Sequence, residues 1–180
     1  MRRLMLLRHA KTEHGEPGGR DQDRRLDARG HKDAAEIGGW IGRHQPFPDC
    51  VFVSPAVRAR QTWEIAWEAM KDRGPQPQVV FLPELYGADS TELLQAIRTA
   101  SATDPKRLML VGHNPGMHEL AVALIGSGDA AGRQRLADNL PTSGLAVFDF
   151  AVSDWDEVAF RRGRLVLFVS PKLLKQASKE

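Results

Sequence analysis

Apolar residues occur in six short runs along the chain, and polar or Gly- and Pro-containing segments separate them. The runs cover residues 4–7, 50–53, 79–82, 107–111, 145–150 and 165–169. Apart from Arg107 and Asp149, these positions are apolar, and a short apolar run flanked by turn residues is typical of a strand that is buried on both faces. We therefore predict six strands. Segment 126–139 is charged and is predicted to be an irregular connection, and the basic tail from Lys172 is predicted to be frayed.

Helical periodicity fills the intervals between the first four strands and follows the fourth. Apolar residues recur at helical spacing in the four segments that begin near Asp27, Ser54-Pro55, Asp89-Ser90 and Asn114-Pro115. Asp, Ser and Asn are preferred N-cap residues, and Pro is favoured in the first helical turn. Pro46 and Pro48 are predicted to mark the end of the first helix, and the second is predicted to run toward Lys71.

The order of these elements predicts an α/β fold. Strands that alternate with helices imply a mostly parallel central sheet with helices on both faces, which is a three-layer α/β/α sandwich. No helix is predicted between the last two strands, so we expect one antiparallel member and a hairpin around Trp155. Nothing in residues 1–180 indicates a linker or a repeat, and we expect a single domain.

Composition narrows the possible classes of function. A net charge of +2 gives no reason to expect a nucleic-acid partner. Cys50 is the only cysteine, so neither an internal disulfide nor a cysteine-based zinc site is expected. No apolar run approaches the length of a membrane span, and the residues after Met1 are too weakly apolar for a signal peptide. We expect a cytoplasmic protein with no membrane partner.

Two predicted strands each lead directly into a histidine. The first ends at Arg8-His9, and the fourth is followed by Gly112 and His113. Ligands of open α/β sheets bind just past the carboxyl ends of the strands. An imidazole nitrogen is a competent nucleophile toward phosphorus, and a guanidinium can hold two phosphoryl oxygens. The alternatives are that Arg8 pairs with a carboxylate, that His9 is a buried structural histidine, and that His113 lies in a capping loop.

A further basic pair and the remaining histidines complete the candidate chemistry. Arg58 and Arg60 follow the second strand, and residues two apart cannot share one face of a helix. We expect Arg58 to bind phosphate and Arg60 to face solvent. The histidines show no His-x-x-x-His spacing, so no metal site and no cofactor are predicted.

Four segments, taken together and in order, resemble the histidine phosphatase superfamily. They are LLRHAKT at 6–12, LDARG at 26–30, SPAVRARQT at 54–62 and VGHNPG at 111–116, and the resemblance extends to PTSG at 141–144. Ala10 stands where much of the superfamily has glycine, and this residue and the short chain are similar to the SixA-type phosphohistidine phosphatases. The resemblance implies a fold like that of the phosphoglycerate mutases.

The resemblance also implies residue roles. His9 would be the nucleophile that becomes a phosphohistidine, and Arg8, Arg58 and His113 would bind the phosphoryl oxygens. Glu84 lies near the place of the acid that ester-cleaving members use as a proton donor. It is either catalytic or holds Arg58 or Arg8, and Asp21 and Asp23 are weaker candidates for the acid.

The expected function is therefore hydrolysis of phosphohistidine on a signalling or phosphotransfer protein, without a metal. An imidazole leaves more easily than an alkoxide because its conjugate acid has a pKa of about 6.5. One alternative is a phosphatase of a small phosphate ester with the same fold. Another is a non-catalytic module that binds phosphorylated partners. The sequence does not indicate an oligomeric state.

Overall fold

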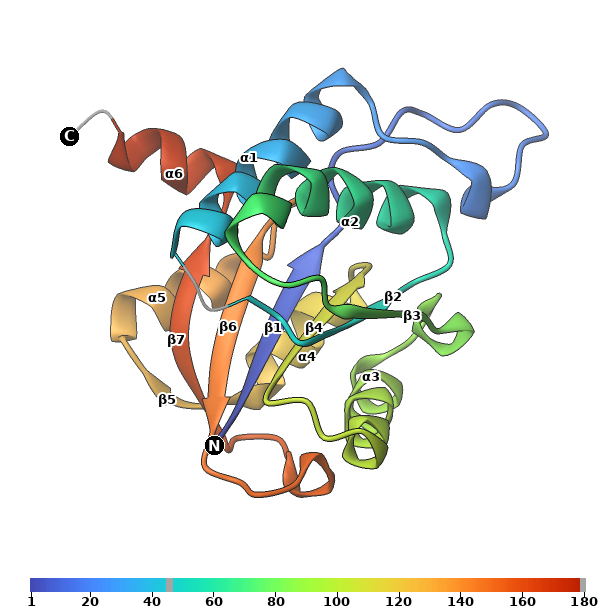
Figure 1. Cartoon of the computed structure of the whole chain (residues 1–180). Helices are drawn as coiled ribbons and strands as arrows, with labels where there is room; N and C mark the ends of the chain where they lie inside the picture. The colour runs from blue at the N-terminus through green and yellow to red at the C-terminus, as the bar shows by residue number, and fades with distance from the viewer. Residues whose placement is uncertain (45–46, 179–180) are drawn as a thin grey trace.

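The protein is described by a computed structural model that covers residues 1–44 and 47–178. Its centre is a seven-stranded sheet with the order β3-β2-β4-β1-β6-β7-β5 (Figure 1). The strands are β1 (Arg2–Arg8), β2 (Cys50–Val53), β3 (Gln78–Phe81), β4 (Arg107–Gly112), β5 (Ile125–Gly128), β6 (Leu145–Phe150) and β7 (Gly163–Val169). Only β6 runs against its neighbours, which confirms the expected single antiparallel member.

Helices cover both faces of this sheet. They are α1 (Ala28–His44), α2 (Val57–Met70), α3 (Ser90–Arg98), α4 (Gly116–Leu124), α5 (Ala130–Asp138) and α6 (Pro171–Ala177). Leu4 and Leu6 of β1 pack in one core with α3, α4 and α5, whereas Met5 and Leu7 pack in a second core with α1 and α2. The apolar run of β1 is continuous because both of its faces are buried. The predicted three-layer α/β/α sandwich is confirmed.

Three predictions about local structure were wrong. Segment 126–139 is not irregular, because it contains β5 and α5. Gly126 permits this edge strand, since a Cβ there would lie 2.1 Å from the carbonyl oxygen of Arg161. The Asp129 side chain caps α5 by accepting from the Gly132 N–H at 2.8 Å. Sequence periodicity missed α5 because its buried residues are only Gly132 and Leu136.

The other two errors concern helix ends. The tail forms α6, whose first N–H groups are capped by Ser170 with Pro171 in the first turn. Helix α2 begins at Val57 rather than at Pro55, since Ser54 turns its hydroxyl toward His113 instead of capping the helix. The Asp27 cap of α1, the Asp89 cap of α3 and the hairpin that contains Trp155 are confirmed. Pro46, expected to help end α1, lies outside the described residues.

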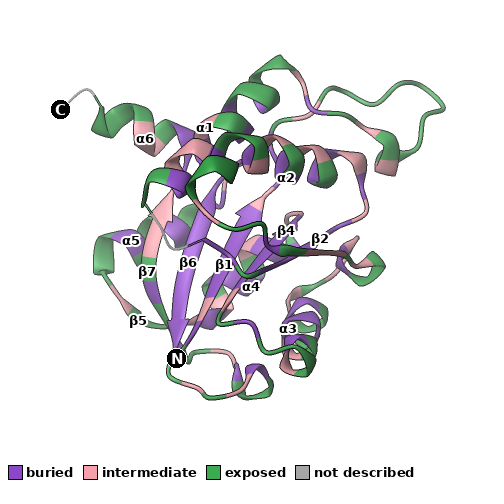
Figure 2. Cartoon of the chain, in the orientation of Figure 1, coloured by how far each residue is buried: buried purple, intermediate pink, exposed green. Residues whose placement is uncertain are grey.

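The parallel part of the sheet determines where the candidate site lies. Strands β1, β2, β3 and β4 are parallel neighbours, so their carboxyl ends meet at one edge. Segment 12–26, which joins β1 to α1, extends from this edge and is largely exposed, in contrast to the buried strands (Figure 2). Arg8 is the last residue of β1, and residues 9, 54–58, 86 and 113 follow the ends of these four strands. Segment 12–26 supplies Asp21 from outside the sheet.

Candidate active site

His9 lies at the carboxyl end of β1 and is held by main-chain contacts. Its N–H donates to the carbonyl oxygen of Gly112 at 3.0 Å, so the first and fourth strands stay paired up to the site. Its ring Nδ1 lies 2.8 Å from the carbonyl oxygen of Ala10. A carbonyl oxygen can only accept, so Nδ1 carries the proton and Nε2 of the neutral ring keeps its lone pair.

The electrostatic environment keeps His9 neutral. Burial of the ring lowers its pKa to about 3, and the nearby charges of Arg58 and Arg8 and the ring of His113 act in the same direction. The hydrogen bond to Ala10 opposes this effect without cancelling it. At neutral pH the ring is therefore uncharged, and a free imidazole nitrogen is available as a nucleophile.

His113 follows β4, and its ring centroid is 5.2 Å from that of His9. Its Nε2 lies 2.6 Å from Ser54 Oγ, and its buried Nδ1 has no partner among the described residues. Burial lowers the pKa of His113 to about 4, and the charge of Arg58 adds to this effect. If the Ser54 hydroxyl donates to Nε2, the neutral ring presents an unpaired N–H at Nδ1. An unsatisfied buried donor of this kind is suited to an oxyanion.

Arg8 reaches the same site without a carboxylate partner in the described residues. Its Nη1 donates to the carbonyl oxygen of Leu140 at 3.1 Å, its buried Nε is unpaired, and burial lowers its pKa. The Leu140 carbonyl also accepts from the side-chain amide of Asn114 at 2.9 Å. Within the described residues Arg8 therefore does not form the ion pair that was the alternative expectation. Most of the N–H donors of its guanidinium remain available to a ligand.

The loop before β6 holds Arg8 and His9 in place through main-chain hydrogen bonds. Ser143 has a positive φ of 58° and donates its N–H to the carbonyl oxygens of Arg8 at 3.1 Å and His9 at 3.2 Å. The Arg8 N–H in turn donates to the Gly144 carbonyl at 3.0 Å. A Cβ on Gly144 would meet the Pro141 carbonyl oxygen at 2.7 Å, so this turn depends on glycine.

Arg58 points from the first turn of α2 into the site, whereas Arg60 is exposed, as expected. Arg58 is already paired. Its Nη1 donates to the main-chain carbonyl of Asp21 at 2.7 Å, and its Nη2 donates to Asp21 Oδ2 at 2.9 Å. The Tyr86 hydroxyl donates to the same carboxylate at 2.5 Å. Tyr86 and Arg58 together hold the pKa of the Asp21 carboxyl far below its usual range.

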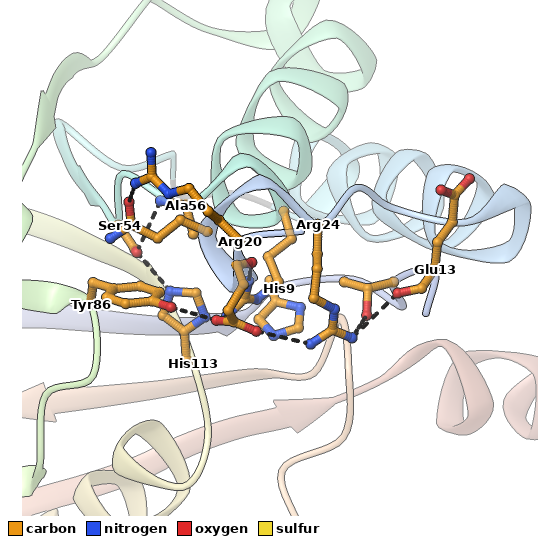
Figure 3. Close-up of polar contacts among 12 residues, drawn as sticks. His9, Glu13, Arg20, Arg24, Ser54, Ala56, Tyr86 and His113 are labelled. Carbon is orange, nitrogen blue, oxygen red and sulfur yellow. Dashed lines mark hydrogen bonds and ion pairs between the residues drawn. The ribbon is translucent and has the colours of Figure 1, made fainter. Parts of the chain in front are cut away.

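Figure 3 shows this arrangement, with Tyr86 beside His113 and with Arg24 on the side of His9. The Tyr86 ring meets the His113 ring edge to face at a centroid distance of 5.6 Å. The guanidinium carbon of Arg58 lies 5.9 Å from the centre of the Tyr86 ring. Two histidines kept neutral, two arginines and one carboxylate thus converge at the ends of adjacent parallel strands.

Known proteins resemble this chain both in sequence and in fold. The model of the histidine phosphatase superfamily (branch 1) matches residues 4–86. An uncharacterized protein of Mycobacterium leprae is 34% identical over 92% of this chain and its own full length. A structure from Agrobacterium tumefaciens, named as a candidate phosphohistidine phosphatase SixA, is 35% identical with a TM-score of 0.78, and the match covers 94% of this chain and 98% of that one.

The chain belongs to the histidine phosphatase superfamily. A second structure named as a candidate SixA, from Nakamurella multipartitia, is 27% identical over 94% of this chain and 96% of its own, with a TM-score of 0.80. A mycobacterial glucosyl-3-phosphoglycerate phosphatase with bound VO3 shares the fold at 16% identity, 94% and 100% coverage and a TM-score of 0.67. The superfamily fold therefore also serves phosphatases named for small esters.

Not every expected residue of this histidine phosphatase reaches the site. Glu84 is exposed, and within the described residues no hydrogen bond or ion pair joins it to Arg8 or Arg58. The loop after β3 instead brings in Tyr86, two residues later. Asp21, a weaker candidate in the sequence, is the acid in contact with the site, and Asp23 is exposed.

Sequence reasoning missed Tyr86, Ser54 and the Leu140 carbonyl. Tyr86 is the only tyrosine of the chain and follows a predicted strand, and these are the sequence signals that point to it. Within residues 1–44 and 47–178, no group of three or more His, Cys, Asp or Glu side chains is placed to hold a metal ion. Of the helices in these ranges, none combines the length and apolar character needed to cross a membrane.

Proposed function

We propose that this protein hydrolyses phosphohistidine on a signalling or phosphotransfer protein through a covalent phosphohistidine at His9. The observation that carries the proposal is the hydrogen bond from His9 Nδ1 to the Ala10 carbonyl, at 2.8 Å. It leaves Nε2 unprotonated beside Arg8, Arg58 and His113, the three groups suited to phosphoryl oxygens.

In the first step, His9 Nε2 attacks phosphorus and the P–N bond of the substrate breaks. A substrate imidazole that carries a proton on its other nitrogen departs as neutral imidazole, so no acid is needed. The new phosphohistidine keeps the proton on Nδ1, which donates a hydrogen bond to the Ala10 carbonyl oxygen. This ring proton makes His9 itself a good leaving group for the second step.

In the second step, water attacks phosphorus and the bond to Nε2 breaks. The products are dihydrogen phosphate and neutral His9, so atoms and charge balance. Arg8, Arg58 and the unpaired Nδ1 of His113 provide the positive and hydrogen-bonding groups that stabilise charge on the transferring phosphoryl. We expect this chemistry to need no metal, so turnover should survive EDTA.

The choice of phosphohistidine over an ester depends on the absence of an available acid near the site in the described residues. Glu84 is exposed and makes no contact with Arg8 or Arg58, and the depressed pKa of Asp21 keeps that carboxyl ionised. Tyr86 is protonated, but hydrogen bonding to Asp21 raises its pKa and makes it a weak acid. An alkoxide leaving group needs a proton, and general acid catalysis is worth about 10²–10⁴ in rate.

The rival function is hydrolysis of a small phosphate ester, which is favoured by the shared fold of the glucosyl-3-phosphoglycerate phosphatase. The deciding experiment measures kcat/KM for a phosphohistidine protein, an aryl phosphate and a panel of alkyl phosphates. We expect the phosphohistidine protein to be the best substrate and the alkyl phosphates the poorest. A preferred alkyl phosphate would establish the rival, and no turnover of any substrate would leave only a phosphate-binding module.

A further inference from the structure

The guanidinium of Arg58, the group expected to bind phosphate, is already hydrogen-bonded to another residue of the protein. Both outer nitrogens of the guanidinium donate to Asp21, one to its main-chain carbonyl at 2.7 Å and one to its carboxylate at 2.9 Å. Arg58 is a buried side chain, whereas the Asp21 side chain is 51% exposed. The fixed partner is therefore the arginine, and the carboxylate approaches it from solvent.

The contact between Asp21 and Arg58 spans two different parts of the fold. Arg58 belongs to α2, but Asp21 lies in segment 12–26, in which every residue before Leu26 is exposed or half-buried. Apart from Asp21, the segment is joined to α2 at its end, where the Leu26 N–H donates to the Gln61 side chain at 2.9 Å and Leu26 lies in an apolar cluster with Ile65. The residues before Leu26 pack little apolar surface onto the body, so moving them costs little hydrophobic free energy.

A carboxylate and a phosphoryl group use the same chemistry toward a guanidinium. Each is an anion whose oxygens accept parallel N–H donors from one planar group. Asp21 remains ionised at every physiological pH, because Tyr86 and Arg58 hold its pKa far below the usual range. A phosphoryl group that approaches Arg58 must therefore compete with this carboxylate for the donors and also meets its negative charge.

We propose that Asp21 is a built-in competitor for the phosphoryl site. Its carboxylate accepts from Arg58, and the Tyr86 hydroxyl donates to the same carboxylate. A phosphoryl group displaces the carboxylate, and segment 12–26 moves away from the site. This inference rests on the proposed role of Arg58 as a phosphoryl ligand.

The proposal assigns a selective role to the contact between Asp21 and Arg58. A small phosphorylated molecule must displace the carboxylate with its phosphoryl group alone. A phosphorylated protein also makes contacts around the rim, and binding energy from parts of a substrate that do not react can offset such a cost. Asp21 would thus act as a specificity-determining residue that disfavours inorganic phosphate and small esters.

The first test compares Asp21→Asn with Asp23→Asn. Both changes remove one negative charge from the same short segment, but Asp23 is exposed and does not contact Arg58. The probes are orthovanadate and inorganic phosphate, measured as inhibition constants and by calorimetry. We expect Asp21→Asn to bind both about two- to fivefold more tightly than wild type, the range expected for a half-exposed ion pair, with little change for Asp23→Asn.

The second test uses Tyr86→Phe, which keeps the aromatic ring and removes only the hydroxyl that holds Asp21. We expect tighter vanadate binding, by a smaller factor than for Asp21→Asn. Adding Tyr86→Phe to Asp21→Asn should give no further gain, because the hydroxyl acts through the carboxylate. Weaker vanadate binding in either single variant would overturn the proposal and make Asp21 or Tyr86 a support for bound phosphate.

The third test follows segment 12–26 directly, by tryptic cleavage at Arg20, Arg24 and Arg25. Saturating phosphate should speed cleavage of the wild type, and Asp21→Asn should be cleaved quickly without phosphate. Protection of the wild type by phosphate would refute the displacement.

Arg58→Ala separates this inference from the proposed function. If vanadate binds that variant as tightly as wild type, the assigned role of Arg58 fails. If Arg58→Ala binds vanadate more weakly than wild type but Asp21→Asn does not bind it more tightly, the role of Arg58 stands and only the proposal that Asp21 competes with phosphate fails.

Discussion

The platform at the strand ends and segment 12–26 meet at the same site but are built in different ways. We use "platform" for Arg8, His9 and His113. His9 and Arg8 are tied to Gly112, Ser143 and Gly144 through main-chain hydrogen bonds. Segment 12–26 is instead joined to the body by hydrogen bonds that involve side chains, chiefly those of Arg58 to Asp21 and of Gln61 to the Leu26 N–H at 2.9 Å.

This difference implies that one region carries out the reaction and the other controls the entry of ligands. Main-chain bonds inside a buried sheet fix the reacting groups to within a narrow range, as transfer of a phosphoryl group requires. Side-chain bonds to an exposed segment are individually weak and can be exchanged for a ligand. Changes in the platform should therefore alter the reaction itself, whereas changes in segment 12–26 should alter how readily ligands enter.

The largest effect should follow loss of the nucleophile. His9→Ala should abolish turnover, because the other neutral histidine of the site, His113, has its Nε2 at 2.6 Å from the Ser54 hydroxyl and is not free to attack. The phosphate on wild-type His9 should be acid-labile and alkali-stable. The labelled enzyme should therefore be trapped with denaturant at alkaline pH before the labelled residue is identified. Turnover in His9→Ala, or label on another residue, would disprove the mechanism. His14→Ala, from segment 12–26, should keep wild-type turnover, and circular dichroism should show both variants folded.

The next largest effect should distinguish two neighbouring arginines. Arg58→Ala removes buried guanidinium donors at the site, and we expect vanadate to bind about tenfold or more weakly, since a charge-assisted hydrogen bond contributes about 1.5–3 kcal/mol. Arg60→Ala, an exposed change on the same helix, should leave the affinity nearly unchanged. Equal losses in the two variants would mean that the arginine facing the site is wrongly assigned.

A smaller effect should appear in the pH dependence of stability. The pKa values of His9 and His113 are lowered to about 3 and about 4, so the unfolded chain binds protons that the folded one does not as pH falls below about 6.5. The free energy of unfolding should therefore fall from pH 7 to pH 5, by about 2 kcal/mol for each of these histidines.

Urea unfolding of three proteins checks this expectation. His9→Ala should lose about half of the pH dependence that the two buried histidines supply. His14→Ala should retain it, because His14 is exposed. The same slope in wild type and His9→Ala would show that the platform histidine is not held neutral by burial.

The smallest effect is expected at Glu84. This residue is exposed and has no contact with Arg8 or Arg58, so Glu84→Gln should leave kcat/KM on a phosphohistidine protein nearly unchanged. On an alkyl phosphate, a poor substrate already, the loss should be somewhat larger. A loss of about 10²-fold or more on the alkyl phosphate, with that ester the preferred wild-type substrate, would make Glu84 the general acid.

The sequence predicted the layers of the fold because its strands are buried on both sides. Runs such as residues 4–7 and 50–53 carry the signal of a doubly covered sheet, and cap residues marked most helix starts. Strand β5 gave no such signal, since its Gly-Ser-Gly sequence pairs at the sheet edge through the close approach of Gly126 to Arg161. Its pairing is a tertiary event that local propensity does not contain.

The platform could be anticipated for a similar reason. Residues that directly follow parallel strands must gather at one edge, which brings Arg8, His9 and His113 together. Asp21 and Tyr86 could not be placed in this way, because Asp21 lies in a long connection and Tyr86 beyond a short turn. Loop conformation, rather than strand order, sets which of Glu84 and Tyr86 faces the site.

The carbonyl oxygen of Leu140 has a consequence for how this site can vary. It accepts from both Arg8 and Asn114, yet a main-chain oxygen is present whatever the side chain. Substitution at position 140 can disturb packing but cannot delete the acceptor. Insertion or deletion of one residue between α5 and β6 would move it out of reach. Loop length, rather than residue identity, is thus the property on which this contact depends, and engineered variants should be designed with that length held constant.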